Sequence, residues 1–284
     1  AASDVYKRQL VNEAALMAAR AGKRFVAMID FENAKDKVMM GAERRSMVMT
    51  DEEKKLTAYH EAGHAIVGLN VPQHDPIHKA TIIPRGRALG LVLSLPERDQ
   101  LSVTRTKYKS KIAMAMGGKV AEEMVFGPEN VTSGASSDIQ QITKIARAMV
   151  MQFGMSDNLG NIDYANEQQT YLGPTSPGSH LGPETQEKID IEVRKLVDEG
   201  YTTAKNILKK EKKKLDLLAN GLLEYETLTG SEITQVLSGK QLNRDLDDFD
   251  EPDDKQNNSS VTSIPKTGTN GRKKGGGLKS QPPS

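Results

Sequence analysis

The sequence contains no cysteine, which excludes disulfide bonds, thiolate-bound zinc and a cysteine nucleophile. Tryptophan is also absent and aromatic residues make up only 4% of the chain, so aliphatic side chains, alanine and the 12 methionines must form the core. This composition favours helices over an aromatic-rich β-sandwich. No apolar run approaches the roughly 20 residues that span a bilayer, and no signal peptide opens the sequence.

Neither positive nor negative charge is in excess. The formal net charge is +1, which gives no reason to expect nucleic acid as the main partner. The 284 residues, of which 37% are hydrophobic and 27% charged, suit a globular protein with one large domain or two smaller ones. We therefore expect a mainly α fold that contains a small β-hairpin or sheet.

Several segments carry apolar residues at helical spacing. Asp30 is the expected N-cap of the second helix, and Thr50 with Glu53 forms a T-x-x-E capping box before the third. The predicted helices cover residues 10–21, 31–41, 51–71, 104–125, 137–153, 184–218 and 231–239.

Near residue 79 the spacing of apolar residues changes from helical to alternating, which predicts strands. Leucines alternate with other residues over 88–95, as in a strand with one buried face, and "ATII" precedes this strand across the turn "PRGR". Residues 155–183 are rich in Gly, Pro and Ser and are predicted to be irregular. Beyond residue 243 the chain becomes acidic and then basic, with too few apolar residues to fold.

The stretch "TAYHEAGHAIVG" places His60 and His64 four residues apart on a predicted helix, with Glu61 between them. Residues at this spacing share one helix face, so two imidazoles can reach one tetrahedral zinc ion. Glu61 points beside such a metal, where a general base can take a proton from zinc-bound water. Gly63 is unfavourable inside a helix, which indicates a packing or access requirement.

Chance spacing is the alternative to a metal site. With 5 histidines in the chain, an H-E-x-x-H pattern arises by chance on the order of once per hundred such sequences. His74 and His78 are also four apart, but Pro76 between them disfavours a regular helix. His180 lies in the Gly- and Pro-rich segment and is not expected to be a ligand.

Two imidazoles do not complete a zinc site, and the sequence offers several third ligands. The extended motif H-E-x-x-H-x-x-G-x-x-H is excluded, because Val67 and Asn70 occupy its last two positions. Three carboxylates remain: Glu122 and Glu123 late in one predicted helix, and Asp138 in the first turn of the next. For the glutamates the alternative is a solvated helix face, which the sequence favours for at least one of them, and for the aspartate it is a favourable position on the helix dipole. Spacing alone does not choose among them.

A family resemblance is carried by a series of segments in order: "LVNEAALMAAR", "MMGAERRS", "TAYHEAGHAIVG", "HKATIIPRGRALG", "GGKVAEEMVFG", "VTSGASSDIQQIT" and "EYETLTGSEI". Over residues 10–240 the chain resembles the C-terminal half of FtsH-type, membrane-anchored, ATP-dependent zinc metalloproteases. The resemblance implies Zn²⁺ bound by His60, His64 and Asp138, and Glu61 as catalytic base. It places Glu122 near the site as a partner of a ligand histidine.

The resemblance also implies a domain division. Residues 1–9 do not match the family pattern and indicate a truncated or misassembled reading frame. Residues 10–45 resemble the end of an AAA ATPase lid, and residues 46–243 resemble the metallopeptidase domain. Residues 244–284 form a tail that is expected to be disordered. The pattern G-x-x-x-x-G-K-[ST] does not occur, so ATP and Mg²⁺ are expected to act only through an ATPase module outside this chain.

The expected function is hydrolysis of unfolded or membrane-extracted polypeptides in protein quality control. The family implies a homohexamer held at the cytoplasmic face of the bacterial inner membrane by an N-terminal anchor, whereas the chain as given is expected to be soluble. Alone, it should cleave unfolded polypeptides without ATP dependence. The alternatives are a non-catalytic scaffold or partner subunit and an autonomous peptidase without an ATPase.

Overall fold

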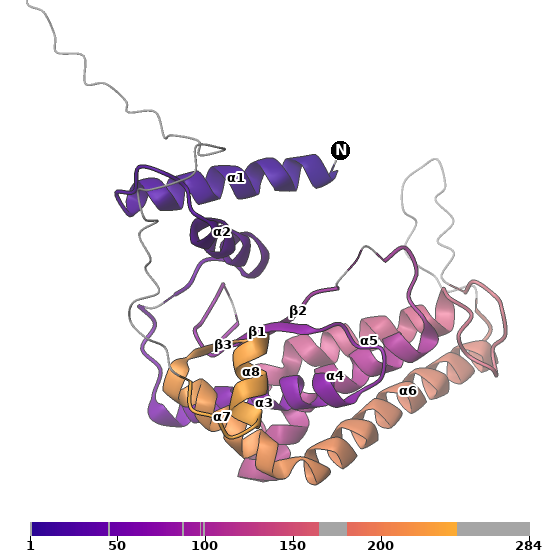
Figure 1. The fold of residues 1–284 in the computed structure, drawn as a ribbon. Helices are drawn as coiled ribbons and strands as arrows, with labels where there is room; N and C mark the ends of the chain where they lie inside the picture. The colour runs from indigo at the N-terminus through magenta and orange to yellow at the C-terminus, as the bar shows by residue number, and fades with distance from the viewer. Residues whose placement is uncertain are drawn as a thin grey trace, which may run out of the picture. The chain divides into compact units, whose positions relative to one another are not determined.

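The structure is a computed structural model that describes residues 2–44, 46–86, 88–96, 98, 100–164 and 181–242. The described residues form two compact units, 2–41 and 42–242 (Figure 1). Helices and one small sheet make up these units, which confirms the predicted mainly α class. No helix in the described ranges is long and apolar enough to cross a membrane. Residues 165–180, which are most of the predicted irregular segment, and the whole predicted tail lie outside the described residues.

The first unit is a pair of helices, α1 (Ala2–Arg20) and α2 (Met28–Met40), whose contact includes alanines that have no exposed surface. The prediction that Asp30 is the N-cap of the second helix is wrong. The helix begins earlier, after Ala27, and the Asp30 carboxylate reaches back to accept the Ala27 backbone N–H at 2.9 Å. Gly41 ends this helix with a φ of 85°, as predicted.

The second unit contains the remaining helices. The central one, α3 (Asp51–Asn70), begins at the predicted capping box: Thr50 accepts the Glu53 backbone N–H, and the Glu53 carboxylate accepts that of Thr50. It packs against α4 and α7, while α6 packs against α4 and α5. The other helices are α4 (Arg105–Phe126), α5 (Ser136–Met151), α6 (Pro183–Lys210), α7 (Lys212–Tyr225) and α8 (Gly230–Leu237), with short 3-10 turns at Pro128–Asn130 and Ser133–Ala135.

The prediction of one continuous helix over 184–218 is wrong. The helix breaks at Glu211, where φ is −101° and ψ is 25°, and the chain turns from α6 into α7. No proline or glycine marks the break. It arises from packing: Leu208 is buried at the end of α6, whereas Leu215 and Leu218 are buried in α7, which packs on α3.

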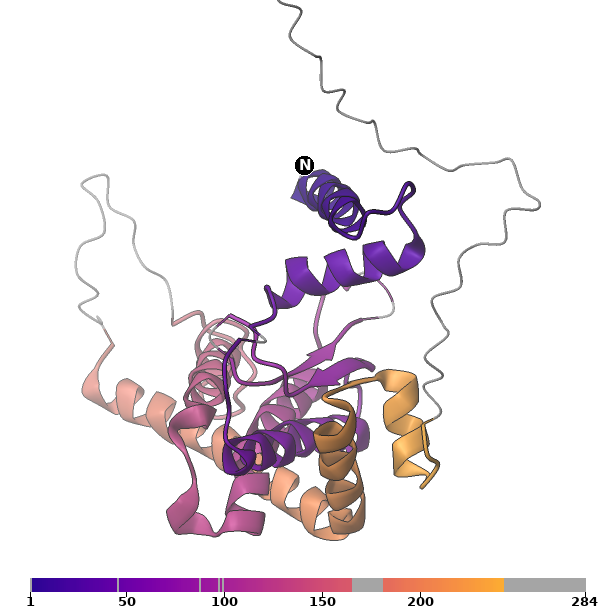
Figure 2. The same cartoon turned by 90° about the vertical axis from the view of Figure 1, so that its left-hand side faces the viewer.

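An antiparallel sheet lies to one side of α3 and α4 in both views (Figure 1, Figure 2). Its strands β1 (Ile77–Thr81), β2 (Leu91–Ser94) and β3 (Thr227–Thr229) are ordered β2-β1-β3. The predicted hairpin is present, and Thr81 pairs with Leu91. The predicted alternation in the second strand is wrong, because all four residues of β2 are half-buried. The third strand was not predicted from its three-residue sequence.

Helices α3 and α4 touch through their backbones. A Cβ atom on Gly63 would lie 2.4 Å from the carbonyl oxygen of Gly117, and one on Gly117 would lie 2.5 Å from the carbonyl oxygen of Gly63. Two glycines are therefore required by space alone, which explains the helix-interior glycine noted in the sequence.

We expect Gly63→Ala to lower the free energy of unfolding by about 1–3 kcal/mol, because the new methyl group overlaps backbone atoms of α4. Gly68→Ala, on the same helix, is the matched control. A Cβ there meets Met114 and His74 at 3.4 Å or more, so this variant should be neutral or slightly more stable. Denaturant unfolding of both variants tests the difference, and equal stabilities would contradict the close contact.

Candidate metal centre

One face of α3 brings the two motif histidines together. Their Nε2 atoms are 3.0 Å apart, and the imidazole rings meet edge to face with centroids 4.6 Å apart. His64 is buried, and the side chain of His60 is 12% exposed. Helical spacing of four residues thus gives two nitrogen atoms that point at one position in space.

Asp138 supplies a third atom from another helix. It lies in the first turn of α5, directly after the short 3-10 turn, and its Oδ2 is 3.2 Å from Nε2 of His60 and 3.3 Å from Nε2 of His64. Three ligand atoms bound tetrahedrally to zinc are about 3.3–3.4 Å apart, given bond lengths of about 2.0–2.1 Å. Among the residues that the structure describes, these three side chains are the group that can hold a metal ion.

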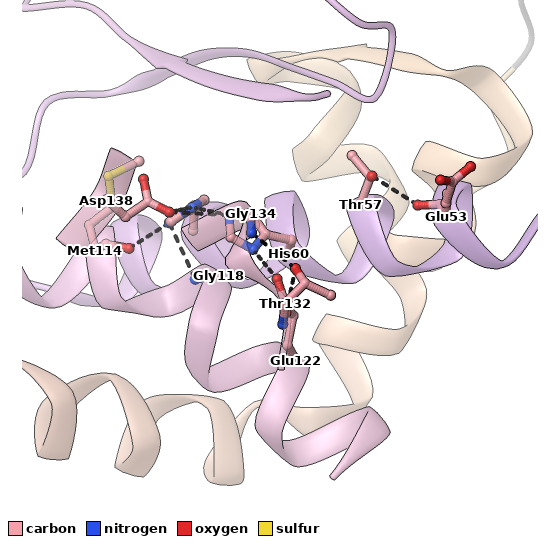
Figure 3. Close-up of polar contacts among 10 residues, drawn as sticks. Glu53, Thr57, His60, Met114, Gly118, Glu122, Thr132, Gly134 and Asp138 are labelled. Atoms are coloured by element: carbon pink, nitrogen blue, oxygen red, sulfur yellow. Dashed lines mark hydrogen bonds and ion pairs between the residues drawn. The ribbon is translucent and has the colours of Figure 1, made fainter. Parts of the chain in front are cut away.

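The far side of each imidazole contacts a group that accepts a hydrogen bond. Nδ1 of His60 donates to Oε1 of Glu122 at 2.7 Å (Figure 3), and Nδ1 of His64 donates to the carbonyl of Met114 at 2.9 Å. The backbone N–H of Gly118 lies 3.3 Å from the same His64 atom and is the weaker contact. Because each Nδ1 carries a hydrogen, the neutral form of each imidazole has its lone pair on Nε2, the atom that faces Asp138.

Glu122 also holds the loop that leads to the aspartate. Its Oε2 accepts the backbone N–H of Thr132 at 2.8 Å and the Thr132 hydroxyl at 3.2 Å. Thr132 in turn accepts the Gly134 backbone N–H, which starts the turn that leads to Asp138. Thr132 was not predicted, because nothing in a small-residue loop indicates which hydroxyl turns inward.

Electrostatics at the centre are those of a cation site. The Oδ2 atom of Asp138 is buried, and the nitrogen atoms that face it are the Nε2 atoms of the two imidazoles. Burial would raise the pKa of Asp138, yet contact with His60 and His64 holds it well below its usual range. Burial alone would lower the pKa of His60, but the close carboxylates of Asp138 and Glu122 outweigh this effect and raise the pKa to about 10. A bound cation would replace that extra proton.

Glu61 lies beside the cluster and is 5% exposed. Burial raises its pKa, the nearby imidazoles oppose this effect, and the negative charge of Asp138 adds to it. Such a carboxylate is a stronger base than a solvated one. A general base is most effective when its pKa approaches the working pH.

The other sequence candidates point elsewhere. The Tyr201 hydroxyl donates to the Glu123 carboxylate at 2.5 Å, so this glutamate faces α6 and not the histidines. His74 lies between α3 and β1 and His78 lies within β1, so neither lies on a helix, as predicted. His180 lies outside the described residues. Of the three carboxylates that spacing left open, Asp138 alone lies within reach of both Nε2 atoms.

Comparisons with known proteins agree with this geometry. Residues 47–236 match the sequence model of Peptidase family M41. The chain is 57% identical over 232 residues to a protein of Caulobacter vibrioides and 55% identical over 233 residues to one of Rickettsia bellii, both named ATP-dependent zinc metalloprotease FtsH. These matches cover 81% and 82% of this chain but 37% and 36% of the relatives, so the chain spans little more than a third of their length. A Haemophilus influenzae protein of the same name is 49% identical over 81% of this chain.

Glu122→Gln should weaken zinc affinity by about 10–100-fold, because it removes the carboxylate that orients His60 and accepts from Thr132. Glu123→Gln is the matched control on the next residue, and we expect its affinity to remain at the wild-type value. Zinc titration against a fluorescent chelator measures both. Equal affinities in the two variants would show that the Glu122 contact does not support the centre.

The metal-free protein should lose stability as the pH rises. The pKa of His60 increases from about 6.5 in the unfolded chain to about 10 in the fold. The proton therefore contributes its full stability below about pH 6.5, and this contribution disappears as the pH approaches 10. With a chelator present, the unfolding midpoint of the wild type should fall across this window, and that of Asp138→Asn should fall less. Parallel curves would contradict the charge coupling.

Proposed function

The chain belongs to Peptidase family M41, and on this premise we propose that it is a zinc-dependent endopeptidase whose active site is the cluster on α3, α4 and α5. The single observation that carries the proposal is the convergence of three ligand atoms within 3.3 Å of one another beside a buried glutamate. The names of the relatives support zinc as the metal.

In this proposal His60, His64 and Asp138 hold the zinc ion. Two nitrogens and one oxygen leave a fourth tetrahedral position open, which distinguishes a catalytic zinc site from a structural one. Glu122 fixes the ring of His60 and keeps the hydrogen on its Nδ1, which leaves Nε2 free to bind metal. The Met114 carbonyl does the same for His64.

Zinc in such a site lowers the pKa of a coordinated water to about 7 and polarises a carbonyl group. Glu61 would act as the general base that accepts a proton from the attacking water. When the C–N bond breaks, Glu61 passes this proton to the leaving amine nitrogen. The second proton of the water, left on the new carboxylic acid, also passes to the amine, so the products are a carboxylate and an ammonium group, and Glu61 returns to its starting state.

Substrate is proposed to be an extended polypeptide that adds to the edge of β2. This strand pairs with β1 on one side and forms an edge of the described sheet. Main-chain hydrogen bonds to an edge strand fix the register of an extended peptide with little regard to its sequence. That mode suits unfolded substrates, and a folded protein must be unfolded first.

The wider context is proposed from the relatives, since the chain spans only part of them. We propose that residues 10–45 are the end of an AAA lid, that 46–243 are the peptidase domain and that 244–284 are a tail. In a longer protein this part would be coupled to an ATPase and assembled as a homohexamer, with an anchor at the cytoplasmic face of the bacterial inner membrane.

The lid proposal agrees with exposed apolar side chains in the first unit. Helices that belong to a larger domain leave such a surface when described as a pair. The exposed residues are Val5, Tyr6, Val11, Leu16, Phe25, Met28, Ile29 and Met39. A non-catalytic scaffold is less well supported, because the chain keeps all three ligands and the base.

Cleavage of casein with parallel zinc analysis tests the proposal. The wild type should bind one zinc ion, cleave unfolded casein without ATP and lose activity with a chelator. Glu61→Gln should keep zinc and lose at least about 100-fold in kcat, because the general base is gone. Asp138→Asn should lose zinc and activity together. Full activity of Glu61→Gln, or tight zinc in Asp138→Asn, would contradict the assigned roles.

A further inference from the structure

Gly90 lies directly against the proposed base. A Cβ atom at this position would be 2.6 Å from Oε1 of Glu61, 2.7 Å from its Cγ and 2.9 Å from its Cδ. The backbone of Gly90 is not in the left-handed region, so an alanine is allowed there by conformation. A Cβ atom at this position therefore has no room unless the Glu61 side chain moves.

The segment that carries Gly90 is held on both sides. Beyond it, Leu91 pairs with Thr81 as the first residue of β2. Before it, Arg85 and Ala88 exchange backbone hydrogen bonds of 2.9 and 3.0 Å across a tight turn. Because pairing fixes the backbone here, a side chain added at Gly90 would displace the glutamate more readily than the strand.

The opposite end of Glu61 is fixed by α3. A glutamate side chain has three rotatable bonds, so a helix position alone does not determine where its carboxylate lies. Burial under Gly90 removes this freedom. The base is thus confined between the helix that carries the histidines and the segment that leads into the edge strand.

We propose that Gly90 is a positioning residue: its bare α-carbon confines the Glu61 carboxylate and sets the separation between this base and the docking edge of β2. The inference rests on the proposed endopeptidase function. It predicts that one methyl group at this position, whose three nearest atoms all belong to Glu61, impairs proton transfer without releasing zinc.

Kinetics of the full chain test the role. Gly90→Ala should lower kcat for an unfolded casein peptide by roughly 100-fold, as expected for a misplacement near 1 Å, with zinc content at the wild-type value. Gly182→Ala is the matched control, because a Cβ there meets nothing within 4 Å, and its kcat should not change. Wild-type kcat in Gly90→Ala, an effect on KM alone, or loss of zinc would each overturn the proposal.

A double-mutant cycle on thermal stability tests the contact without activity. Gly90→Ala should lower Tm by about 2–10 °C in the wild-type background through overpacking. In the Glu61→Ala background the space is empty, and the same change should have little effect. Equal shifts in both backgrounds would overturn the contact. A wild type that cleaves nothing would refute the proposed function itself, whereas an active wild type with an unaffected Gly90→Ala refutes only this inference.

Discussion

The backbone contact between α3 and α4 is the constraint on which the rest of the site depends. Because Gly63 and Gly117 have no side chains, the two helices approach until the backbone of each touches the other. At this separation Glu122 reaches His60, and the Met114 carbonyl reaches His64. Both imidazoles therefore turn their Nε2 atoms to the same point. A wider crossing would leave the histidines on one helix face but without the partners that orient them.

Charge balance gives the second constraint. The carboxylates of Glu61, Glu122 and Asp138 gather around two imidazoles in a poorly solvated region. Isolated buried carboxylates are costly unless positive charge or hydrogen bonds compensate them. Contact with His60 and with Thr132 keeps the pKa of Glu122 low despite burial. The remaining negative charge at Asp138 is matched by a second proton on His60 in the metal-free state, or by a divalent cation.

The local features of the site could be predicted from the sequence, and the long-range ones could not. Thr50, Glu53 and the pair of histidines belong to one helix, so capping and period determine them. The position of Asp138, the proposed third ligand, depends on how the loop between α4 and α5 folds back onto Glu122, and residue spacing does not encode that. The adjacent Glu122 and Glu123 differ only in helix face, yet one contacts His60 and the other Tyr201. The break at Glu211 likewise has no breaker residue, since packing of α7 on α3 produces it.

X-ray absorption at the zinc K-edge of the zinc-loaded chain tests the central claim most directly, because it reports the ligands of the metal itself. We expect a four-coordinate ion with two imidazole nitrogens at about 2.0–2.1 Å, one carboxylate oxygen and one further light atom. In Asp138→Asn the spectrum of any remaining zinc should change in its oxygen shell while the imidazole scattering persists. A wild-type spectrum with fewer than two imidazoles, or one that Asp138→Asn leaves unchanged, would contradict the assignment of His60, His64 and Asp138 as the metal centre.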